Sequence, residues 1–289
     1  MLSLNKSCVV HDINADLHAH STVSDGTMKP HALVARAHEQ GVELFALTDH
    51  DELSGLDEAS AAASDLGLAF VPGVEVSVTF AGQTVHVVGL GIDVNDEGLR
   101  DGLASIRSGR MLRAQQMADG LAAVGIHGAL EGALHYAGNL DLVSRTHFAR
   151  WLVEINACSD VREVFGKYLV AGKPGYVPTR WARLSEAIGW IRGAGGVAVL
   201  AHPGRYKFND TELWAVLSEF KEAGGTALEV VTSNHGAVQI RRFAKLAQDF
   251  GFEASRGSDF HGPGESIAEL GRVQALPNAL TPVWHRFVH

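Results

Sequence analysis

The sequence predicts an α/β protein with a mainly parallel sheet and an all-helical insertion. Apolar runs rich in β-branched residues alternate with amphipathic helical patterns near both ends of the chain. Between about residues 97 and 184 the strand pattern disappears. His, Asp and Glu recur where the apolar runs end. With 289 residues, of which 46% are hydrophobic, the chain can bury a full core.

Taken in order, the strand and helix patterns alternate as βα units. Strands are expected near 13–19, 43–48, 68–77, 84–91, 196–201, 226–232 and 252–258. Helices are expected at 29–40, 52–66, 185–194, 210–223 and 236–250. Pro30 falls in the first turn of a helix, and Gly41, Gly67 and Gly251 each follow a helix end. The βα domain is therefore predicted to comprise residues 13–96 and 185–289.

The segment 97–184 is predicted to form a helical cap. GLASIRSGRMLRAQQMADGLAAVG and RTHFARWLVEIN have the spacing of amphipathic helices. A cap at this place in the chain would overhang the end of the sheet that carries the neighbouring loops. The first dozen residues, MLSLNKSCVVHD, are expected to be a poorly ordered lead-in.

Composition excludes several classes of protein. The net charge of −9 argues against binding of duplex DNA through a broad basic face, although a small phosphorylated substrate remains compatible with it. There is no apolar run of about 18 residues and no signal-peptide pattern, so we expect no membrane span and a cytoplasmic location. Cys8 and Cys158 form no CxxC pair, which argues against a disulfide framework or a thiolate zinc site. Nothing indicates a protein partner.

The stretch ADLHAHSTVSDG contains a candidate metal-binding pattern. Side chains alternate along a strand, so His18 and His20 point the same way, with Asp16 in the same row. One ion could be held by both histidines. Because HxH also occurs on solvated strands, the interpretation depends on residues elsewhere in the chain.

Ligand-type residues recur at the ends of the later strands. They are Asp49, His50 and Asp51 after the second, Glu75 on the third, His86 on the fourth, His202 after the fifth, His235 after the sixth, and Asp259 and His261 after the seventh. In a parallel α/β barrel such ends form one mouth. Imidazole and carboxylate without thiolate favour Zn²⁺, Mn²⁺ or Fe²⁺ over Ca²⁺. Nine candidates exceed the needs of one ion and predict two or three metals: His18, His20, Asp25, His50, Glu75, His86, His202, Asp259 and His261.

The motifs DLHAHSTVSDG, TDHD, the Glu75 strand, AHP and GSDFH together resemble those of the PHP (polymerase and histidinol phosphatase) family of metal-dependent phosphoesterases. The resemblance implies a distorted, TIM-like (β/α)7 barrel with a three-metal centre, Mn²⁺ being expected and Zn²⁺ or Fe²⁺ the alternatives. It also implies a metal-bound hydroxide as nucleophile. The implied ligands are His18, His20, Glu75 and Asp259 for a first ion, Glu75, His86 and His202 for a second, and Asp25, His50 and His261 for a third.

VSRTHFARWLVE and GKPGYVPTRW resemble one branch of short PHP enzymes, which remove the 3′-phosphate of nucleoside 3′,5′-bisphosphates and trim short RNA from its 5′ end. The resemblance implies Arg145 as a bidentate phosphate donor and Ser144 as a second contact. Where that branch commonly shows SRPHFA, this chain has Thr146 in place of proline, next to His147. In TSNHG, we expect His235 to contact the scissile phosphate or to protonate the leaving oxygen.

The expected reaction converts adenosine 3′,5′-bisphosphate to AMP and phosphate. Tyr176 or Trp181 of the cap is expected to stack on the base. One alternative is a histidinol-phosphate phosphatase or another small phosphomonoesterase. Another is a silent, metal-stabilised interaction module, against which stand the nine filled ligand positions.

Several polar residues have more ordinary interpretations. Asp16 is expected either to hydrogen-bond a metal-binding side chain from behind or to be a buried hydrogen-bonding group. Asp49 and Asp51 are expected to cap the next helix. Arg205 and Arg256 are expected near the mouth, contacting phosphate or forming surface ion pairs. The remaining histidines are not expected to be ligands: His11, His31, His38, His127, His135, His285 and His289.

Overall fold

The computed structural model of the protein describes residues 13–178 and 181–288. The expected lead-in, with Cys8 and His11, lies outside these residues, as does His289. Within them, Cys158 is a buried free thiol. No helix of the described ranges is long and apolar enough to cross a membrane.

The described strands and helices follow the predicted alternation. The strands are β1 Ala15–Asp16, β2 Leu44–Leu47, β3 Ala69–Phe80, β4 Gln83–Leu90, β5 Ala182–Arg183, β6 Val197–Leu200, β7 Ala227–Thr232 and β8 Glu253–Gly257. The helices are α2 Pro30–Glu39, α3 Leu56–Leu66, α4 Glu97–Arg107, α5 Arg110–Ala122, α6 Ala129–Tyr136, α7 Arg145–Glu154, α8 Val161–Val164, α9 Leu184–Gly193, α10 Asp210–Glu222 and α11 Ala237–Phe250. Short helical turns are η1 Leu140–Leu142, η2 Phe165–Leu169, η3 Pro203–Arg205 and η4 Val283–Arg286.

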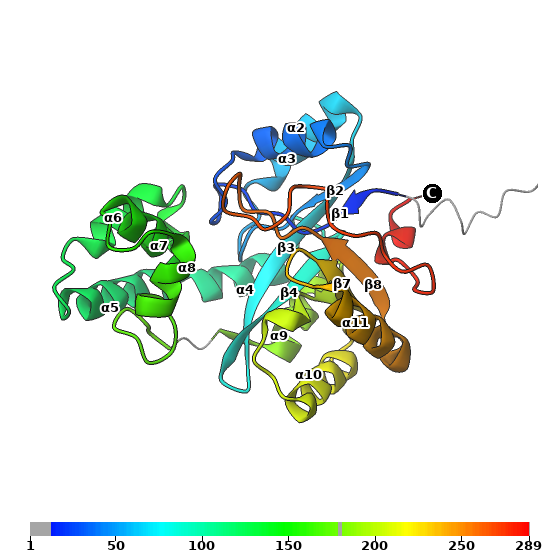
Figure 1. The fold of residues 1–289 in the computed structure, drawn as a ribbon. Helices are drawn as coiled ribbons and strands as arrows, with labels where there is room; N and C mark the ends of the chain where they lie inside the picture. Colours follow the sequence, from blue (N-terminus) through cyan, green and yellow to red (C-terminus); the bar gives the residue numbers. More distant parts are fainter. Residues whose placement is uncertain (1–12, 179–180, 289) are drawn as a thin grey trace, which may run out of the picture.

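The sheet forms a nearly closed barrel of seven strands in the order β1-β2-β3-β4-β6-β7-β8 (Figure 1), which confirms the predicted fold class. Pairing is parallel through β1, β2 and β3 and again through β6, β7 and β8. The segment after β1 lies against β8, where the Leu17 N–H donates to the Arg256 carbonyl at 3.1 Å. The ends of β1 and β8 are thereby brought to the same mouth.

Strand β4 departs from the predicted parallel arrangement. It pairs antiparallel with both β3 and β6, and Ser77 lies opposite His86. Only Ala81 and Gly82 separate β3 from β4, whereas a parallel connection needs about a dozen residues or more. The prediction that His86 lies at the carboxyl end of a strand is therefore wrong. It lies in the first half of β4, which the reversed direction brings to the mouth.

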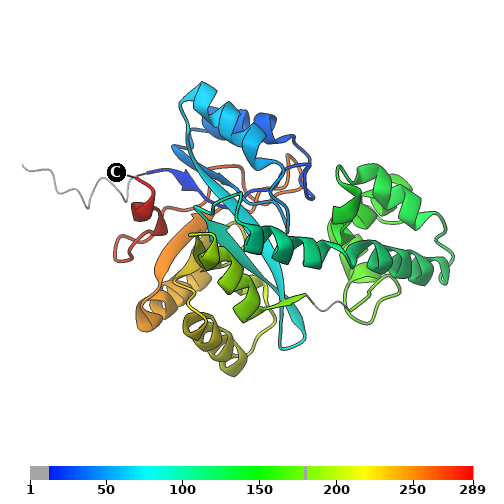
Figure 2. The ribbon, with the colours of Figure 1, turned by 180° about the vertical axis from the view of Figure 1, so that it is seen from behind.

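Helices cover the outside of the barrel. In Figures 1 and 2, α2 and α3 lie on one side of the sheet, and α9, α10 and α11 lie on the other. Buried residues such as Leu33 of α2, Ile188 of α9 and Phe243 of α11 pack into one core with the strands. Helix α3 starts at Leu56, later than predicted, because the Glu52 carboxylate accepts the N–H groups of Leu53 and Ser54 in a preceding turn.

A second core lies in the cap, beside the barrel. Its buried members come from α5, α6, α7 and the turns that follow, including Met117, Ala133, Phe148 and Leu169. Helix α4 leads from the sheet towards the cap in Figure 2, yet its buried residues, Leu99 among them, pack in the barrel core. The boundaries at 97 and 184 stay a prediction.

Candidate metal centre

Nitrogen and oxygen atoms of the candidate ligands converge at the mouth in three overlapping groups. The central group comprises His18, His20, Glu75 and Asp259, and the ligand atoms within it all lie within 4.8 Å of one another. The outer group, whose ligand atoms also lie within 4.8 Å of one another, comprises His20, Asp25, His50 and His261. The strand group comprises His50, Glu75 and His86.

Glu75 lies at the middle of the cluster. Its Oε2 atom is 3.3 Å from Nε2 of both His18 and His20, and 3.1 Å from Nδ1 of His50. Its Oε1 atom is 2.9 Å from His86 Nδ1 and 2.9 Å from His202 Nε2. The two oxygens of one carboxylate thus face two different sets of histidines. This arrangement suits a carboxylate that bridges two cations.

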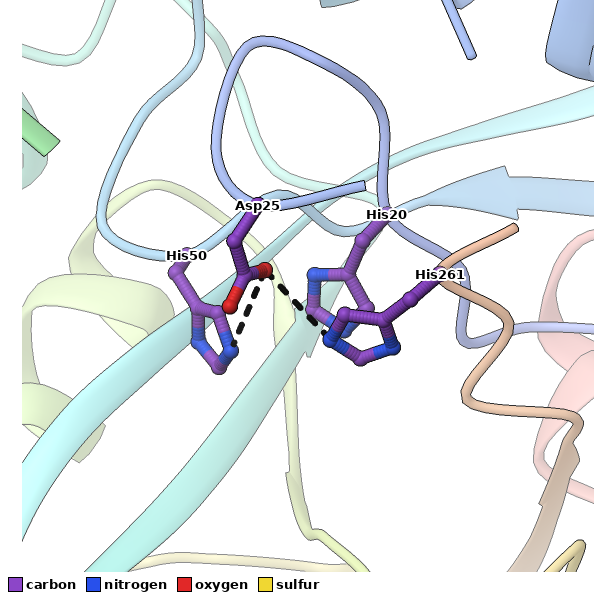
Figure 3. A group of neighbouring side chains, drawn as sticks. All are labelled: His20, Asp25, His50 and His261. Atoms are coloured by element: carbon purple, nitrogen blue, oxygen red, sulfur yellow. Dashed lines mark ion pairs between the residues drawn. The ribbon is translucent and has the colours of Figure 1, made fainter. Parts of the chain in front are cut away.

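The outer group is built from loops. Figure 3 shows Asp25 between His50 and His261, with His20 beside them. The Asp25 Oδ1 atom lies 3.4 Å from His261 Nε2 and 3.9 Å from His50 Nε2. His20 is stacked between the rings of His50 and His261, at centroid distances of 4.6 and 4.2 Å. The sequence predicts His20 as a ligand of the first ion alone, whereas the structure places it in both the central and the outer group.

The cluster contains buried polar atoms whose hydrogen-bonding capacity is not used by the described protein groups. They are His18 Nε2, both ring nitrogens of His20, Asp25 Oδ1, His50 Nδ1, Glu75 Oε2 and His202 Nδ1. Leaving a buried polar atom without a partner is costly. Most of these atoms point into the cluster, where a divalent cation would satisfy them. The donor set therefore fits the ions implied by the sequence.

The electrostatics of the cluster also favour a bound cation. Burial opposes ionisation of Glu75, but His86, His18 and His50 outweigh it and hold the pKa of the carboxyl well below its usual value. Burial likewise opposes the charged form of His20, yet Asp259 and Glu75 raise its pKa to about 10. Buried His202 has a pKa lowered to about 4 and is a neutral imidazole. The ionised carboxylates require positive charge beside them, which a bound cation supplies.

Two of the candidate ligands have strained backbones. His202 has φ 27° and Asp259 has φ 55°, in the left-handed region that non-glycine residues rarely adopt. Such conformations cost roughly 1–3 kcal/mol each and persist where surrounding structure fixes them. Gly257, two residues before Asp259, lets β8 lie close to His18, because an added Cβ would be 2.3 Å from His18 Cβ. The backbone is thus arranged for the cluster at a cost in stability.

Glu229, a buried carboxylate for which the sequence predicts no role, holds two of the candidate ligands in place. Glu229 of β7 contacts His18 Nδ1 at 3.0 Å and accepts the His202 N–H at 2.6 Å. Carboxylates behind metal-binding histidines fix the orientation of the ring. The signal in the sequence was a glutamate within the apolar run ALEVVT, since a buried charge requires a partner.

Asp49 and Asp51 do not cap the next helix, contrary to the prediction. Asp49 accepts hydrogen bonds from Ser21 N and Oγ and from Ser24 Oγ, which fixes the turn after His20. Asp51 accepts from Ser77 N and Oγ and pairs with Arg110. Helix α3 begins at Leu56, and its N-cap residue, Gly55, has no side chain to cap it. Both aspartates support the site rather than the helix.

Asp16 and Arg256 are buried and make their hydrogen bonds within the protein. Asp16 accepts the N–H groups of Ser258 and Gly271 at 2.8 and 2.7 Å, so the buried hydrogen-bonding role is the one the structure supports. Arg256 donates to the carbonyls of Ala15, Gly271, Val273 and Gln274. The prediction of Arg256 near the mouth is therefore wrong, because its donors are used inside the protein. Arg205 does reach the mouth and pairs with Asp259.

His235 does not have a free ring nitrogen. Nδ1 lies 2.9 Å from the Val230 carbonyl, and Nε2 accepts the Gly204 N–H at 3.0 Å. The ring also stacks on Phe243 at 4.6 Å. These contacts contradict the expected role in binding or protonating phosphate, because both nitrogens are occupied by backbone groups.

Of the histidines not expected to be ligands, the described ones lie outside the three groups. His31 pairs with Glu58 and His285 with Glu253, both at the surface. His38, His127 and His135 are exposed.

An arginine-lined cavity adjoins the cluster on the cap side. It has a volume of about 270 Å³ and is lined by His50, His86, His202, His261, Ser144, Trp181 and four arginines, namely Arg110, Arg113, Arg145 and Arg205. Arg145 opens helix α7, Ser144 caps that helix, and buried His147 accepts the Ser144 N–H at 3.1 Å. Arg110 and Arg113 lie over the Trp181 ring, at 4.7 and 5.4 Å from its centroid. Tyr176 does not line the cavity.

A β/α barrel whose mouth gathers imidazoles and carboxylates beside arginines defines a metallohydrolase type of site. The PHP domain model matches residues 16–242, and the chain belongs to the PHP domain family.

Three known proteins are similar over nearly the whole chain. A 3′,5′-nucleoside bisphosphate phosphatase of Chromobacterium violaceum is 49% identical, covering 94% of this chain and 95% of that protein. The 5′-3′ exoribonuclease Rnm of Escherichia coli is 43% identical, over 93% and 92%. A solved structure of an amidohydrolase from C. violaceum, with bound sulfate, has a TM-score of 0.92 at 48% identity and covers 95% of each chain.

Proposed function

We propose that this protein is a metal-dependent phosphatase that removes the 3′-phosphate of nucleoside 3′,5′-bisphosphates, for example converting adenosine 3′,5′-bisphosphate to AMP and phosphate. The observation that carries the proposal is the arginine-lined cavity that opens beside the candidate metal cluster. A bisphosphate has two dianionic groups, and the site would offer a positive region for each, namely the arginines and the cations bound at the cluster. The similarity to the C. violaceum phosphatase supports the same substrate class.

The metal ligands proposed are the nine residues of the sequence analysis. His18, His20, Glu75 and Asp259 would hold one ion, Glu75, His86 and His202 a second, and Asp25, His50 and His261 a third. Mn²⁺ is the proposed metal, because mixed imidazole and carboxylate ligands suit it. Zn²⁺ and Fe²⁺ bind the same kinds of ligand and are the alternatives. Bound divalent cations supply Lewis acidity towards phosphoryl oxygens and a nucleophile at neutral pH.

Arg113 and Arg145 are the groups proposed to bind the second phosphate. Among the described residues, neither forms an ion pair with a carboxylate, unlike Arg110 and Arg205. Burial lowers the pKa of Arg145, and burial with Arg145 and Arg110 nearby lowers that of Arg113 to about 9. Both guanidinium groups still carry charge at neutral pH. A bound phosphate would relieve the repulsion between them.

A wider groove supports the proposal that short RNA is also a substrate. It has a volume of about 1100 Å³ and runs between the cap and the loop after β8. Thr146, Phe165, Arg205 and His261 line both this groove and the smaller cavity. A nucleotide chain could therefore extend away from the cluster, as the similarity to exoribonuclease Rnm also suggests.

The substrate class is tested by phosphate release with Mn²⁺ present. We expect kcat/KM for adenosine 3′,5′-bisphosphate to exceed that for histidinol phosphate and for AMP by at least about tenfold, a difference of 1.4 kcal/mol. Histidinol phosphate has one phosphate and an ammonium group, which the arginines would repel. Equal or greater activity on histidinol phosphate would refute the proposed substrate and favour the histidinol phosphatase.

Arg145→Ala is expected to raise KM for adenosine 3′,5′-bisphosphate by about 10- to 100-fold, because a hydrogen bond to a charged group is worth about 1.5–3 kcal/mol. The kcat/KM for 3′-AMP, which lacks the 5′-phosphate, should change little. Arg241→Ala, at an exposed position of α11, is the matched control and should leave both substrates unaffected. An equal loss on both substrates would show that Arg145 does not bind the second phosphate.

A further inference from the structure

The first turns of cap helix α7 contact the loop that carries Asp25. Thr146 Oγ1 donates to Asp25 Oδ2 at 3.1 Å, and Ser144 Oγ lies 3.5 Å from the same oxygen. The Thr146 N–H donates to Ser144 Oγ at 3.2 Å, which fixes that hydroxyl as well. The cap therefore holds one of the two carboxylate oxygens of Asp25.

The other oxygen of Asp25 is turned towards the outer group. Oδ1 has no hydrogen-bond partner among the described residues and lies 3.4 Å from His261 Nε2. With Oδ2 held by Thr146, rotation of the carboxylate is restricted, and Oδ1 stays directed at the histidines (Figure 3). Groups that bond the outer oxygen of a ligating carboxylate orient it for the metal.

One turn further along α7, Arg150 connects the same loop to the segment after His261. Its Nη2 donates to the Asp25 carbonyl at 2.7 Å. Its guanidinium also makes two hydrogen bonds to Glu265, at 2.8 and 2.6 Å. Ser266, the next residue, accepts the His261 N–H at 2.7 Å. Helix α7 thus fixes the two loop segments that supply Asp25 and His261.

From these contacts we propose that Thr146 is a positioning residue, through which the cap sets Asp25 for a divalent cation in the outer group. The contact depends on the residue type, because a residue without a hydroxyl group at this position could not donate to Asp25 Oδ2. Threonine therefore adds a link between cap and metal position. The inference rests on the metal site of the proposed function.

The test compares Thr146→Val, which removes the hydroxyl at nearly constant shape, with Thr146→Ser, which keeps it. Mn²⁺ binding is measured by titration of the metal-free protein and by metal content after equilibrium dialysis. We expect Thr146→Val to weaken the weakest Mn²⁺ site by about 10- to 100-fold, the usual effect of losing a partner behind a ligand. Thr146→Ser should bind as the unaltered protein does. The Mn²⁺ concentration for half-maximal activity should rise in parallel, with kcat restored at saturating Mn²⁺.

Thr211→Val is the matched control, since Thr211 is exposed and occupies the same second position of helix α10. If Thr146→Val is poorly folded, Thr146→Pro serves in its place, because proline is tolerated in the first turn of a helix. Unchanged Mn²⁺ affinity in the variants would overturn the inference, as would a lower unfolding temperature of the metal-free protein with no change in affinity. Failure of the unaltered protein to bind Mn²⁺ would instead refute the metal site of the proposed function.

Discussion

Glu75→Gln is expected to lower phosphatase activity by at least about 1000-fold, the upper range for losing one preorganised electrostatic group. The Glu75 carboxylate lies within 3.3 Å of nitrogen atoms of five histidines. A neutral amide keeps the size but cannot offer an anionic oxygen to both sides of the cluster. Phosphate release from adenosine 3′,5′-bisphosphate measures the loss, and metal analysis should show fewer bound ions.

Glu253→Gln provides the matched control for this change. Glu253 lies on β8 and pairs with Arg286 at the surface, outside the three groups. Its replacement should leave activity and metal content unchanged. If Glu75→Gln retained activity, the metal cluster would have no part in the reaction, and the silent interaction module would become the better description.

Removal of divalent metals by a chelator is expected to abolish activity and to lower the unfolding temperature by at least about 5 °C. A site saturated at 100 times its Kd contributes about 2.7 kcal/mol, and each kcal/mol corresponds to about 2–4 °C in a chain of 150–250 residues. Without cations the buried carboxylates of Glu75, Asp25 and Asp259 have only the neighbouring histidines and Arg205 to balance their charge. Calorimetry and phosphate release measure the two effects.

Adding metals back distinguishes the loss of bound cations from irreversible unfolding of the protein. Mn²⁺ should restore both activity and unfolding temperature, whereas Ca²⁺, which prefers oxygen ligands, should restore neither fully. Far-UV circular dichroism of the metal-free protein should retain its helical signal, because the barrel and cap cores lie away from the cluster. Full activity in protein shown to be free of metal would contradict the proposed mechanism.

Local patterns in the sequence predict the barrel and most of the cluster because both depend on short-range features. Alternating apolar runs mark the strands, and the carboxyl ends of parallel strands meet at one mouth. His18, Asp25, His202 and Asp259 could therefore be brought together without a structure. The sequence predicts His86 at the mouth too, but for an incorrect reason, because the two-residue turn after Phe80 requires an antiparallel pair of strands.

Roles that depend on tertiary partners could not be predicted in the same way. Asp49 has the sequence context of a helix cap, but the hydroxyls of Ser21 and Ser24 compete for its carboxylate. Arg256 precedes the GSDFH motif, yet the direction of its side chain depends on carbonyls from both ends of the chain. His235 is taken up by backbone groups whose positions depend on the fold around η3. A sequence pattern contains no information on such competition.

Building the cluster partly from strand interiors and partly from loops makes its positions unequal in rigidity. Glu75 and His86 lie within the longest pair of hydrogen-bonded strands, so their backbones move only if the barrel opens. Asp25 and His261 lie on connecting segments, secured by contacts with α7. Metal exchange with the surroundings should therefore be fastest at the outer group. When the supply of metal is limiting, the outer group should be the first to lose its ion.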